Sequence, residues 1–469
     1  MKLLNSLTHQ VEDIEPSKKN NLSIYSCGPT VYNSAHIGNL MSYIVADTIA
    51  RVARSSGLEV NHVMNITDID DKTIKASECH KCPDGDHNGW LKNYTTGITN
   101  KFYEDLDKLN INRDNYKFTL ATDYIDSMIK MISDLEEAGI AYAADDGLYF
   151  SIDKYKQSGK KYGQLVNITA QSTGAARIDN DEYDKESIHD FALWKKRTEK
   201  EPYWTYKSSK TTMDGRPGWH IECSAMSAST LGLPFDIHTG GVDLRFPHHE
   251  NEIAQSTAIT EGKMANYFIH SEHLLVDGKK MSKSLKNFYT LEDIVDKGYD
   301  PLAFRMLVLR SKYNRPTNFT WEALDEAQEQ LYKLRELGDR WYQEADENSP
   351  VLDQDKIIGG LKSIINDDLN TPKFISYIFE AFDKKLSGEE FSGIDDSEII
   401  LRYIDNALGL DIMTRGDITK EHRKLIDQRN EAKNDNNYTL SDKIRDQLKD
   451  QSIGVRDSDS GTTWYRLYK

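Results

Sequence analysis

Hydrophobic and polar positions change period along the chain, and the first segment follows a strand–helix–strand pattern. Residues 21–27 form a short apolar run that enters a Gly-Pro turn, and residues 40–55 carry apolar positions three and four apart. A second short apolar run covers residues 59–65. These patterns predict a strand, an amphipathic helix and another strand. That order is typical of a parallel β–α–β unit.

After residue 320 the pattern becomes helical. Apolar residues three and four apart predict helices over 321–343, 354–366, 371–386 and 441–451. Two short apolar runs, at 454–456 and 463–467, predict strands that close the chain.

Residues 129–214 interrupt the α/β pattern. They are rich in Lys, Asp and Ser with scattered aromatic residues, and the stretch 195–218 resembles a loop. We interpret this segment as an insertion between two halves of an α/β domain.

Composition limits the possible classes of protein. A chain of 469 residues with 38% hydrophobic and 29% charged residues fits a globular enzyme of about three domains. It has no apolar run near the roughly 20 residues needed to span a bilayer, and its start has no secretory signal. Four cysteines are too few for a disulfide framework, so we expect a reducing cytoplasm with thiols free to bind metal.

Positive charge is concentrated at one place in a chain whose net charge is −17. Four lysines fall within eight residues at 279–286. Taken alone, such a lysine-rich loop is usually a solvated surface turn. About 240 residues earlier, the sequence AHIGNL at 35–40 opens the predicted helix, and it places His36 and Gly38 where free backbone N–H groups favour phosphate. Together the two motifs predict a site that holds the triphosphate of ATP by positioning and charge neutralisation.

A second group of residues resembles a metal site. His248 and Glu252 are four residues apart in FPHHENE, Cys223 lies 25 residues upstream of His248, and Cys27 lies beside the nucleotide motif. Two thiolates, an imidazole and a carboxylate can bind Zn²⁺. Two buried structural cysteines beside a surface helix explain the spacing equally well.

A third cysteine motif, Cys79-x-x-Cys82 with His80 and His87, resembles an incomplete zinc knuckle. Because no second Cys-x-x-Cys follows, we interpret residues 79–87 as a polar loop with incidental thiols.

The chain resembles the cysteinyl-tRNA synthetases, a family of class I aminoacyl-tRNA synthetases, over essentially its whole length. The matching stretches are CGPTVY at 27–32, AHIG at 35–38, NITDIDDK at 65–72, GRPGWHIECSAM at 215–226, FDIH at 235–238, GG at 240–241 with DL at 243–244, FPHHENEIAQ at 246–255, KMSKS at 280–284 and DDLNTP at 367–372. Residues 79–90 do not match, and we assign them no role.

The resemblance implies roles for residues that match the family's motifs. It implies that ATP contacts His36, Gly38, Asn39, Lys280, Ser282 and Lys283, with His36, Lys280 and Lys283 catalytic and Mg²⁺ accompanying the ATP. It also implies one Zn²⁺ per chain, bound by Cys27, Cys223, His248 and Glu252. Asn39 is a departure, since the family usually has a second histidine there.

A zinc ion would explain how such an enzyme rejects serine. Pocket size alone discriminates weakly between serine and cysteine, whereas a thiolate is a far better zinc ligand than an alcohol. Since four protein groups would already fill a tetrahedral site, we predict that Glu252, the hardest ligand, is weakly or variably bound. Trp219 is a candidate wall of the side-chain pocket or a core tryptophan. Asp243 is a candidate partner of the substrate ammonium or a turn residue.

The implied fold is α/β: a Rossmann-type nucleotide-binding catalytic domain with an inserted connective segment, followed by a helical bundle and a small C-terminal mixed α/β domain. The expected boundaries are 1–128 and 215–270 for the two catalytic halves, 129–214 for the insertion, 271–320 for the signature-loop region, 321–410 for the bundle and 411–469 for an anticodon-binding domain.

The implied reaction has two steps, in which the cysteine carboxylate attacks the α-phosphorus of ATP and a tRNA hydroxyl then attacks the adenylate. Partners would be tRNA(Cys), ATP and L-cysteine, with no membrane and no obligate protein partner, in a cytoplasmic monomer. Candidate tRNA contacts are Lys443, Arg445 and Trp464, the last by base stacking. Two alternatives are a ligase that joins cysteine to an amino sugar and a catalytically silent tRNA-binding protein.

Overall fold

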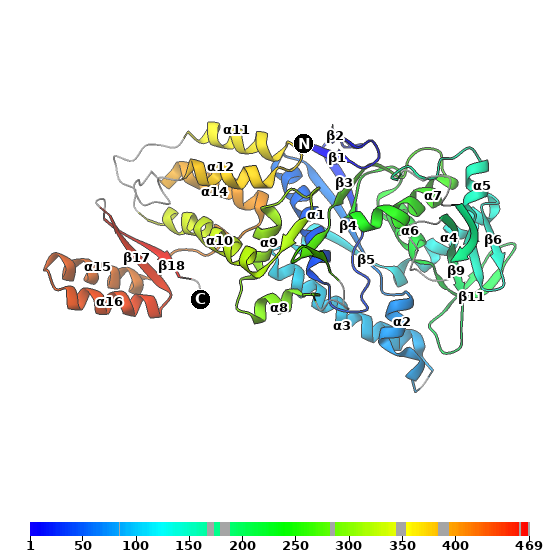
Figure 1. Cartoon of the computed structure of the whole chain (residues 1–469), viewed down its shortest axis with the longest axis horizontal. Coiled ribbons are helices and arrows are strands. Elements are labelled where there is room, and N and C mark those ends of the chain that lie inside the picture. The colour runs from blue at the N-terminus through cyan, green and yellow to red at the C-terminus, as the bar shows by residue number, and fades with distance from the viewer. Residues whose placement is uncertain are drawn as a thin grey trace.

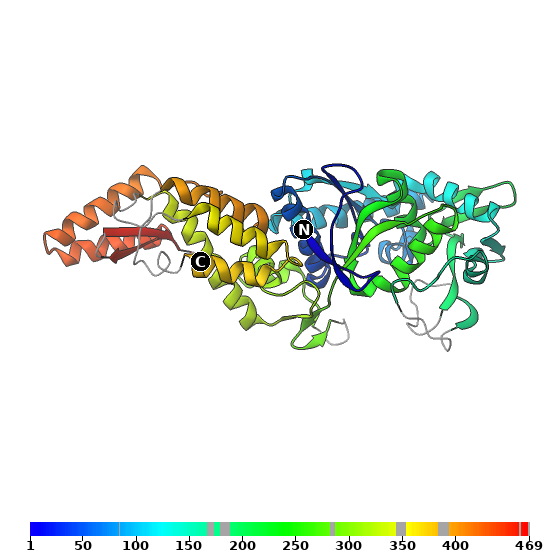
Figure 2. The same cartoon turned by 90° about the horizontal axis from the view of Figure 1, so that it is seen from above.

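The computed structural model describes residues 1–83, 85–166, 173–178, 188–281, 287–343, 353–382, 394–458 and 461–467. Its parts lie in a row along the longest axis, which both views show (Figures 1 and 2). A small C-terminal unit lies at one end, a group of helices follows it, a twisted sheet lies near the middle and a second sheet lies at the other end.

The middle sheet has five parallel strands in the order β13-β12-β3-β4-β5. Their bounds are β3 Asn21–Ser26, β4 Glu59–Ile66, β5 Tyr116–Leu120, β12 Phe235–Gly241 and β13 Ala265–Ser271. Numbered along the chain, this is the doubly wound order 3-2-1-4-5, in which the direction of winding changes between the first and fourth strands. The predicted strand–helix–strand unit and the Rossmann-type fold are therefore confirmed.

Helix α1 (Ile37–Ser55) covers one face of this sheet because its apolar residues are buried on that side. Ile24 of β3 packs with Ile44 of α1 in one hydrophobic core, which continues into the C-terminal helices. Tyr25, the next residue of β3, points into a different core with Val63 and the inserted segment. Successive residues of β3 thus point into two different cores, so both faces of the sheet are buried.

Helices α2 (Asp71–Ser77) and α3 (His87–Lys108) connect β4 to β5. Residues 79–87 are only partly the loop that the sequence predicted. Cys79–Lys81 is a helical turn, His87 begins α3, and Cys79 is buried because Ile74 and Leu91 pack in the same core.

The insertion contains a second sheet of order β10-β11-β9-β7-β6, with β8 paired to β9. Its elements are α4 Ile125–Glu137, β6 Ala141–Ala144, β7 Gly147–Phe150, α5 Ile152–Gln157, β8 Thr173–Ile178, β9 Ile188–Lys196, β10 Trp204–Lys207 and β11 Thr212–Pro217. The prediction of a loop over 195–218 is wrong. β10 and β11 form an antiparallel hairpin that continues through β9, and their outward polar residues hide the strand pattern.

Two helices then return the chain to the middle sheet and carry residues of the candidate site. They are α6 (Trp219–Leu231) and α7 (Glu250–Ala258), which pack against each other. The amino-terminal hairpin of β1 (Lys2–Asn5) and β2 (Gln10–Asp13) lies against β13.

The remaining elements form the helical part and the C-terminal unit. They are β14 Leu274–Val276, β15 Lys279–Lys280, α8 Leu291–Asp296, α9 Pro301–Leu309, β16 Thr317–Phe319, α10 Trp321–Trp341, α11 Gln354–Ile365, α12 Thr371–Ala381, α14 Ile394–Leu408, α15 Lys420–Asn434, α16 Tyr438–Asp450, β17 Ile453–Ser458 and β18 Gly461–Arg466. The predicted helices and closing strands are confirmed; α12 ends at Ala381, and residues 383–386 of that prediction lie outside the described residues. Helices α8, α9, α14 and α15 were not predicted.

Among the described residues, no helix is both long and apolar enough to cross a bilayer.

Candidate active site and metal centre

The candidate site lies where the winding of the middle sheet reverses, at the carboxyl ends of β3 and β12. In doubly wound folds this position binds ligands. Cys27 directly follows β3, Gly241 ends β12, and both line a pocket of about 420 Å³. The pocket also includes His36, Asn39 and Lys280. The fold therefore brings the two nucleotide motifs and one end of the metal motif to the same hollow.

His36 caps α1 and closes a capping box with Asn39. The Asn39 backbone N–H donates to His36 Nδ1 at 3.1 Å, and the His36 N–H donates to Asn39 Oδ1 at 3.4 Å. The AHIG motif at 35–38 is thus held at the helix start, where backbone N–H groups favour anions. Asn39 performs a capping role that does not need a second imidazole.

Residues 288 and 289, which follow the lysine-rich segment 279–286, lie beside the start of α1. The Ile37 N–H donates to the Tyr289 carbonyl at 2.9 Å, and the His36 ring contacts Phe288 edge-on, with 4.9 Å between ring centroids. At Gly38, a Cβ atom would lie 2.5 Å from Cε of Met281, so a larger residue here would displace the Met281 side chain. Lys280 is exposed and lines the pocket, whereas Ser282 and Lys283 lie outside the described residues.

The four predicted metal ligands come together. Donor atoms of Cys27, Cys223, His248 and Glu252 all lie within 4.8 Å of one another, and all four residues are buried. The two sulfur atoms are 3.9 Å apart, and the Cys27 sulfur is 3.8 Å from Glu252 Oε1. Two sulfurs bonded to one tetrahedral zinc at about 2.3 Å would lie roughly 3.8 Å apart, so the thiol pair has a suitable spacing.

Three histidines that the sequence did not single out surround this group. His220 Nδ1 lies 2.8 Å from His248 Nδ1, and His238 Nε2 lies 2.8 Å from Glu252 Oε2. His249 Nε2 lies 3.3 Å from the Cys27 sulfur. Metal-binding imidazoles and carboxylates in proteins are usually oriented by such hydrogen bonds.

A second donor set shares two of these residues. Cys27, His238, His249 and Glu252 also place donor atoms within 4.8 Å of one another. In the first set, His248 and Glu252 each keep a hydrogen-bond partner for their other polar atom, namely His220 and His238. In the second set His238 would bind the metal and could no longer hydrogen-bond Glu252, and the thiol of Cys223 would have no metal to bind. The first set is therefore the better ligand set.

Burial sets the ionisation of the group. It raises the pKa of the Cys27 and Cys223 thiols, and the neighbouring Glu252 carboxylate raises both further. Burial also lowers the pKa of His248 to about 3, although Glu252 opposes this shift. A neutral imidazole is the metal-binding form of histidine, and a bound cation would offset the cost of two buried thiolates. The donor chemistry fits a borderline-soft divalent metal.

Trp219 and Asp243 both line the pocket. Trp219 is half-buried, and its ring lies against His248 with 4.2 Å between centroids. Asp243 is exposed in the short helical turn after β12. Lys72 and Tyr32 also line the pocket and were not assigned a role from the sequence, although both fall within matching motifs.

The candidate tRNA contacts divide into two kinds. Lys443 and Arg445 are exposed on α16. Trp464 is only 4% exposed and packs with Leu448 and Val455, so the prediction that it stacks on an RNA base is wrong. Periodicity could not show whether this aromatic residue faces inward. Tyr438, at the start of α16, is 59% exposed, and the sequence did not single it out.

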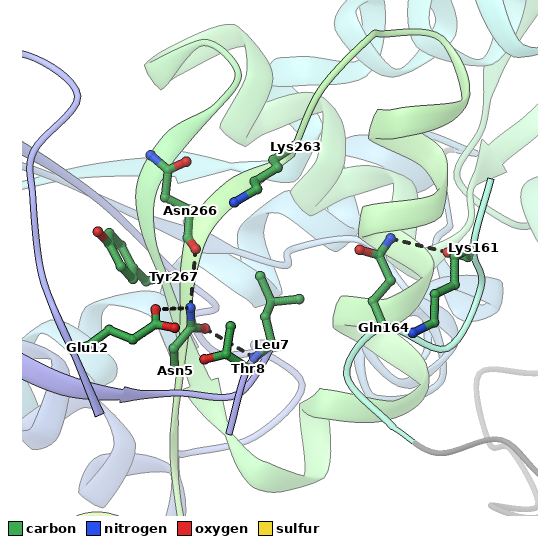
Figure 3. Close-up of a pocket in the computed structure, with 9 residues that line it drawn as sticks. All are labelled: Asn5, Leu7, Thr8, Glu12, Lys161, Gln164, Lys263, Asn266 and Tyr267. Carbon is green, nitrogen blue, oxygen red and sulfur yellow. Dashed lines mark hydrogen bonds between the residues drawn. The ribbon is translucent and has the colours of Figure 1, made fainter. Parts of the chain in front are cut away.

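The cysteine motif at residues 79–87 forms no metal group among the residues that the structure describes. His87 Nδ1 instead lies 2.8 Å from the Cys79 carbonyl oxygen. A second pocket, also about 420 Å³, lies at the amino end of β13 beside the first hairpin (Figure 3). Its Asn5 amide donates to Glu12 at 2.9 Å, and no predicted site residue lines it.

Comparisons with known proteins agree with this geometry. Residues 13–329 match the family model described as the catalytic domain of class I (C) tRNA synthetases. A cysteine–tRNA ligase of Brachyspira hyodysenteriae is 39% identical over 98% of each chain, and one of Solibacter usitatus is 38% identical over 99% of each.

Solved structures share the fold at low sequence identity. A methionyl-tRNA synthetase of Mycobacterium tuberculosis in complex with methionyl-adenylate has a TM-score of 0.55 and 12% identity, covering 84% of this chain and 90% of that one. A LeuRS of Agrobacterium radiobacter in a ternary complex with tRNA and LeuAMS has a TM-score of 0.57, with 12% identity and 86% of each chain covered.

Proposed function

The chain belongs to the cysteine–tRNA ligases among the class I tRNA synthetases, and from this membership we propose how its residues select cysteine and support both steps of the reaction. The protein is an enzyme that attaches cysteine to tRNA, with ATP as the other substrate. The finer proposal is that it forms cysteinyl-adenylate and transfers the amino acid to the 3′ end of tRNA(Cys).

Family membership supports a metal cofactor, and we propose that the ion is zinc, one per chain, held by Cys27, Cys223, His248 and Glu252. When bound, zinc supplies preferential binding of a thiolate over an alcohol, which would exclude serine. Glu252 is the hardest of the four donors and is predicted to be the most weakly held. Its other oxygen bonds to His238, so the carboxylate keeps a partner if its first oxygen is released.

The amino-acid end of the pocket would be completed by Trp219 and Asp243. The Trp219 ring lies against His248, so it can form a wall beside the substrate side chain. Asp243 presents an exposed carboxylate to the same hollow and would pair with the substrate ammonium.

At the nucleotide end, His36 and Lys280 would neutralise the triphosphate together with Mg²⁺ and with Lys283. Gly38 and Asn39 shape the helix start, and Ser282 would shape the loop. Their function is positioning and charge neutralisation, which suits attack of a carboxylate on the α-phosphorus.

For tRNA, we propose that Lys443 and Arg445 contact the anticodon region, and the exposed Tyr438 replaces Trp464 as the candidate for base stacking. A monomer in the cytoplasm stays a prediction. Neither alternative function is supported, since the relatives along the whole chain are named as cysteine–tRNA ligases.

The observation that carries the proposal is the meeting of four buried donor groups at the reversal point of the sheet, beside the two nucleotide motifs. Its test is cysteine-dependent exchange between ATP and pyrophosphate, with serine as the competing amino acid and with metal content measured on the same samples. We expect exchange with cysteine only and one zinc per chain.

Cys223→Ser should lose both the zinc and the exchange. Cys82→Ser is the matched control, because Cys82 is a thiol outside the cluster. Exchange that persisted in the absence of zinc would refute selection by the metal, and absence of exchange in the wild type under all conditions would refute the proposed activity.

A further inference from the structure

Lys72 lies at the pocket rim in the first turn of α2, the helix that follows β4. The described residues that line the pocket include two lysines, Lys72 and Lys280, and no arginine. Lys72 Nζ lies 5.9 Å from the centre of the Tyr32 ring, the side chain is exposed, and no ion pair joins it to another described residue. Its ammonium group therefore faces the pocket with its charge available.

The carboxylate next to Lys72 is already neutralised. Asp71 pairs with Lys195 through one oxygen, at 2.7 Å, and with Arg216 through the other. Both cations are buried, with less than a tenth of each side chain exposed. Asp71 is therefore occupied by two other cations and does not pair with Lys72.

The other two carboxylates of this turn are bound by backbone groups. Asp70 caps α2 and accepts the Thr73 N–H at 2.7 Å, while Asp68 accepts the Thr122 N–H at 2.9 Å. The capping box fixes the first turn of α2, and Tyr32 is held by the Tyr94 hydroxyl, which donates to its carbonyl at 2.8 Å. Lys72 thus belongs to a preorganised rim.

This rim lies near the amino-acid end of the pocket. Arg216, which holds Asp71, is three residues before Trp219 and the start of α6, and Tyr32 follows the turn that begins at Cys27. His36 and Lys280, by contrast, are the groups assigned to the triphosphate. A polyanion that brings a hydroxyl to this end of the pocket would find the exposed ammonium group of Lys72 at the rim.

We propose that Lys72 binds the last phosphodiester of the tRNA, the one that joins the 3′-terminal nucleoside, during transfer of the amino acid. This inference rests on the proposed function and adds a contact for its second step. The neutralised Asp71 pair acts as a positioning group that keeps Lys72 in place, and the Tyr32 ring supports the ammonium from one side.

The test compares Lys72→Ala with Lys75→Ala, because Lys75 is an exposed lysine one turn later in the same helix and outside the pocket. We expect Lys72→Ala to leave cysteine-dependent pyrophosphate exchange unchanged. Transfer from preformed adenylate in a single turnover should slow by roughly 10- to 100-fold, the effect of losing one hydrogen bond to a charged group. Lys72→Arg should restore most of the rate.

A modified tRNA identifies the contact. Replacing the last phosphodiester by a neutral methylphosphonate should slow transfer by the wild type and by Lys75→Ala, and should have little further effect on Lys72→Ala. Equal and independent losses in all three proteins would overturn the proposal, as would a matching loss of pyrophosphate exchange in Lys72→Ala. If the wild type itself lacks exchange, the proposed function fails and not this contact.

Discussion

His220 is a single residue on which the metal group depends without belonging to it. Its Nδ1 lies 2.8 Å from Nδ1 of His248, so it can accept that N–H and leave Nε2 of His248 facing the other donors. Nε2 of His248 is the atom 3.0 Å from Glu252. We expect His220→Phe to weaken metal binding by about 10- to 100-fold, the usual effect of losing an orienting partner.

The measurement is competition for zinc against a chelator of known affinity. His273→Phe is a suitable control, since His273 lines the same pocket but is not in the metal group. Equal zinc affinity in wild type and His220→Phe would show that packing alone orients His248.

His62 gives the folded state a dependence on pH. Burial lowers its pKa to about 3, and its Nε2 lies 2.7 Å from the Ser26 hydroxyl. Between pH 6.5 and about 3 the unfolded chain binds a proton at this position that the folded chain does not bind. Stability therefore falls as the pH decreases through this window, by about 1.4 kcal/mol per pH unit for this group.

In urea unfolding at pH 6, 5 and 4, the free energy of unfolding should fall more steeply in the wild type than in His62→Gln, by about 1.4 kcal/mol per pH unit. His80→Gln serves as the control, because His80 is exposed. An unchanged slope in His62→Gln would show that His62 takes up its proton without unfolding.

At the scale of elements, the sequence predicted β3, α1 and β4 because each has one strong period and a clear turn signal. Short strands were harder. β10 and β11 have four and six residues with polar outer faces, and they become strands only because β10 pairs with β11 and β11 pairs with β9. Tertiary pairing of this kind leaves no local pattern.

The site shows the same limit. The four metal ligands were assigned through motifs shared with a family, whereas His220, His238 and His249 become important only through contacts between distant residues. Trp464 illustrates the opposite error, because an aromatic residue in a short terminal strand has the same sequence pattern whether it faces RNA or a small core.

Helix α9 is joined to α1 by a buried ion pair. Arg305 is fully buried and donates to Asp47 of α1 at 2.6 Å, and it also bonds the Leu109 and Leu408 carbonyls. Burial by itself would raise the pKa of Asp47, but Arg51 and Arg305 outweigh it and hold that pKa below its ordinary value. Arg305 thus ties the nucleotide helix to the helical part.

Removing one partner of a buried pair leaves unsatisfied polar groups. We expect Arg305→Met to lower the free energy of unfolding by about 3–5 kcal/mol. Arg402→Met, which removes an exposed ion pair with Glu398, should cost less than about 1 kcal/mol. Urea denaturation of both variants decides the matter, and similar small losses would mean that Arg51 alone satisfies Asp47.

At the scale of the whole molecule, the C-terminal unit is attached to the end of α10 by a compact polar joint. Asp339 is buried and pairs with Arg466, and it accepts the Arg466 N–H at 3.0 Å. Gln343, one turn later, exchanges two hydrogen bonds of 2.9 Å with the Trp464 backbone. The β17–β18 hairpin therefore continues directly from the helix that packs on α9.

A rigid joint would support the tRNA contacts proposed for the C-terminal unit, because a fixed spacing between two binding places raises the effective concentration of the second contact. Asp339→Asn keeps the size of the side chain but removes the charge that holds Arg466. We expect the KM for tRNA to rise about tenfold, the change that a loss of about 1.4 kcal/mol in binding produces. Pyrophosphate exchange should not change, because the joint lies outside the pocket.

The control is Glu329→Gln, which changes an exposed carboxylate on the same helix. If Asp339→Asn instead slowed exchange and left the KM for tRNA unchanged, the joint would act on the active site through the helices and not on the spacing of the two tRNA contacts.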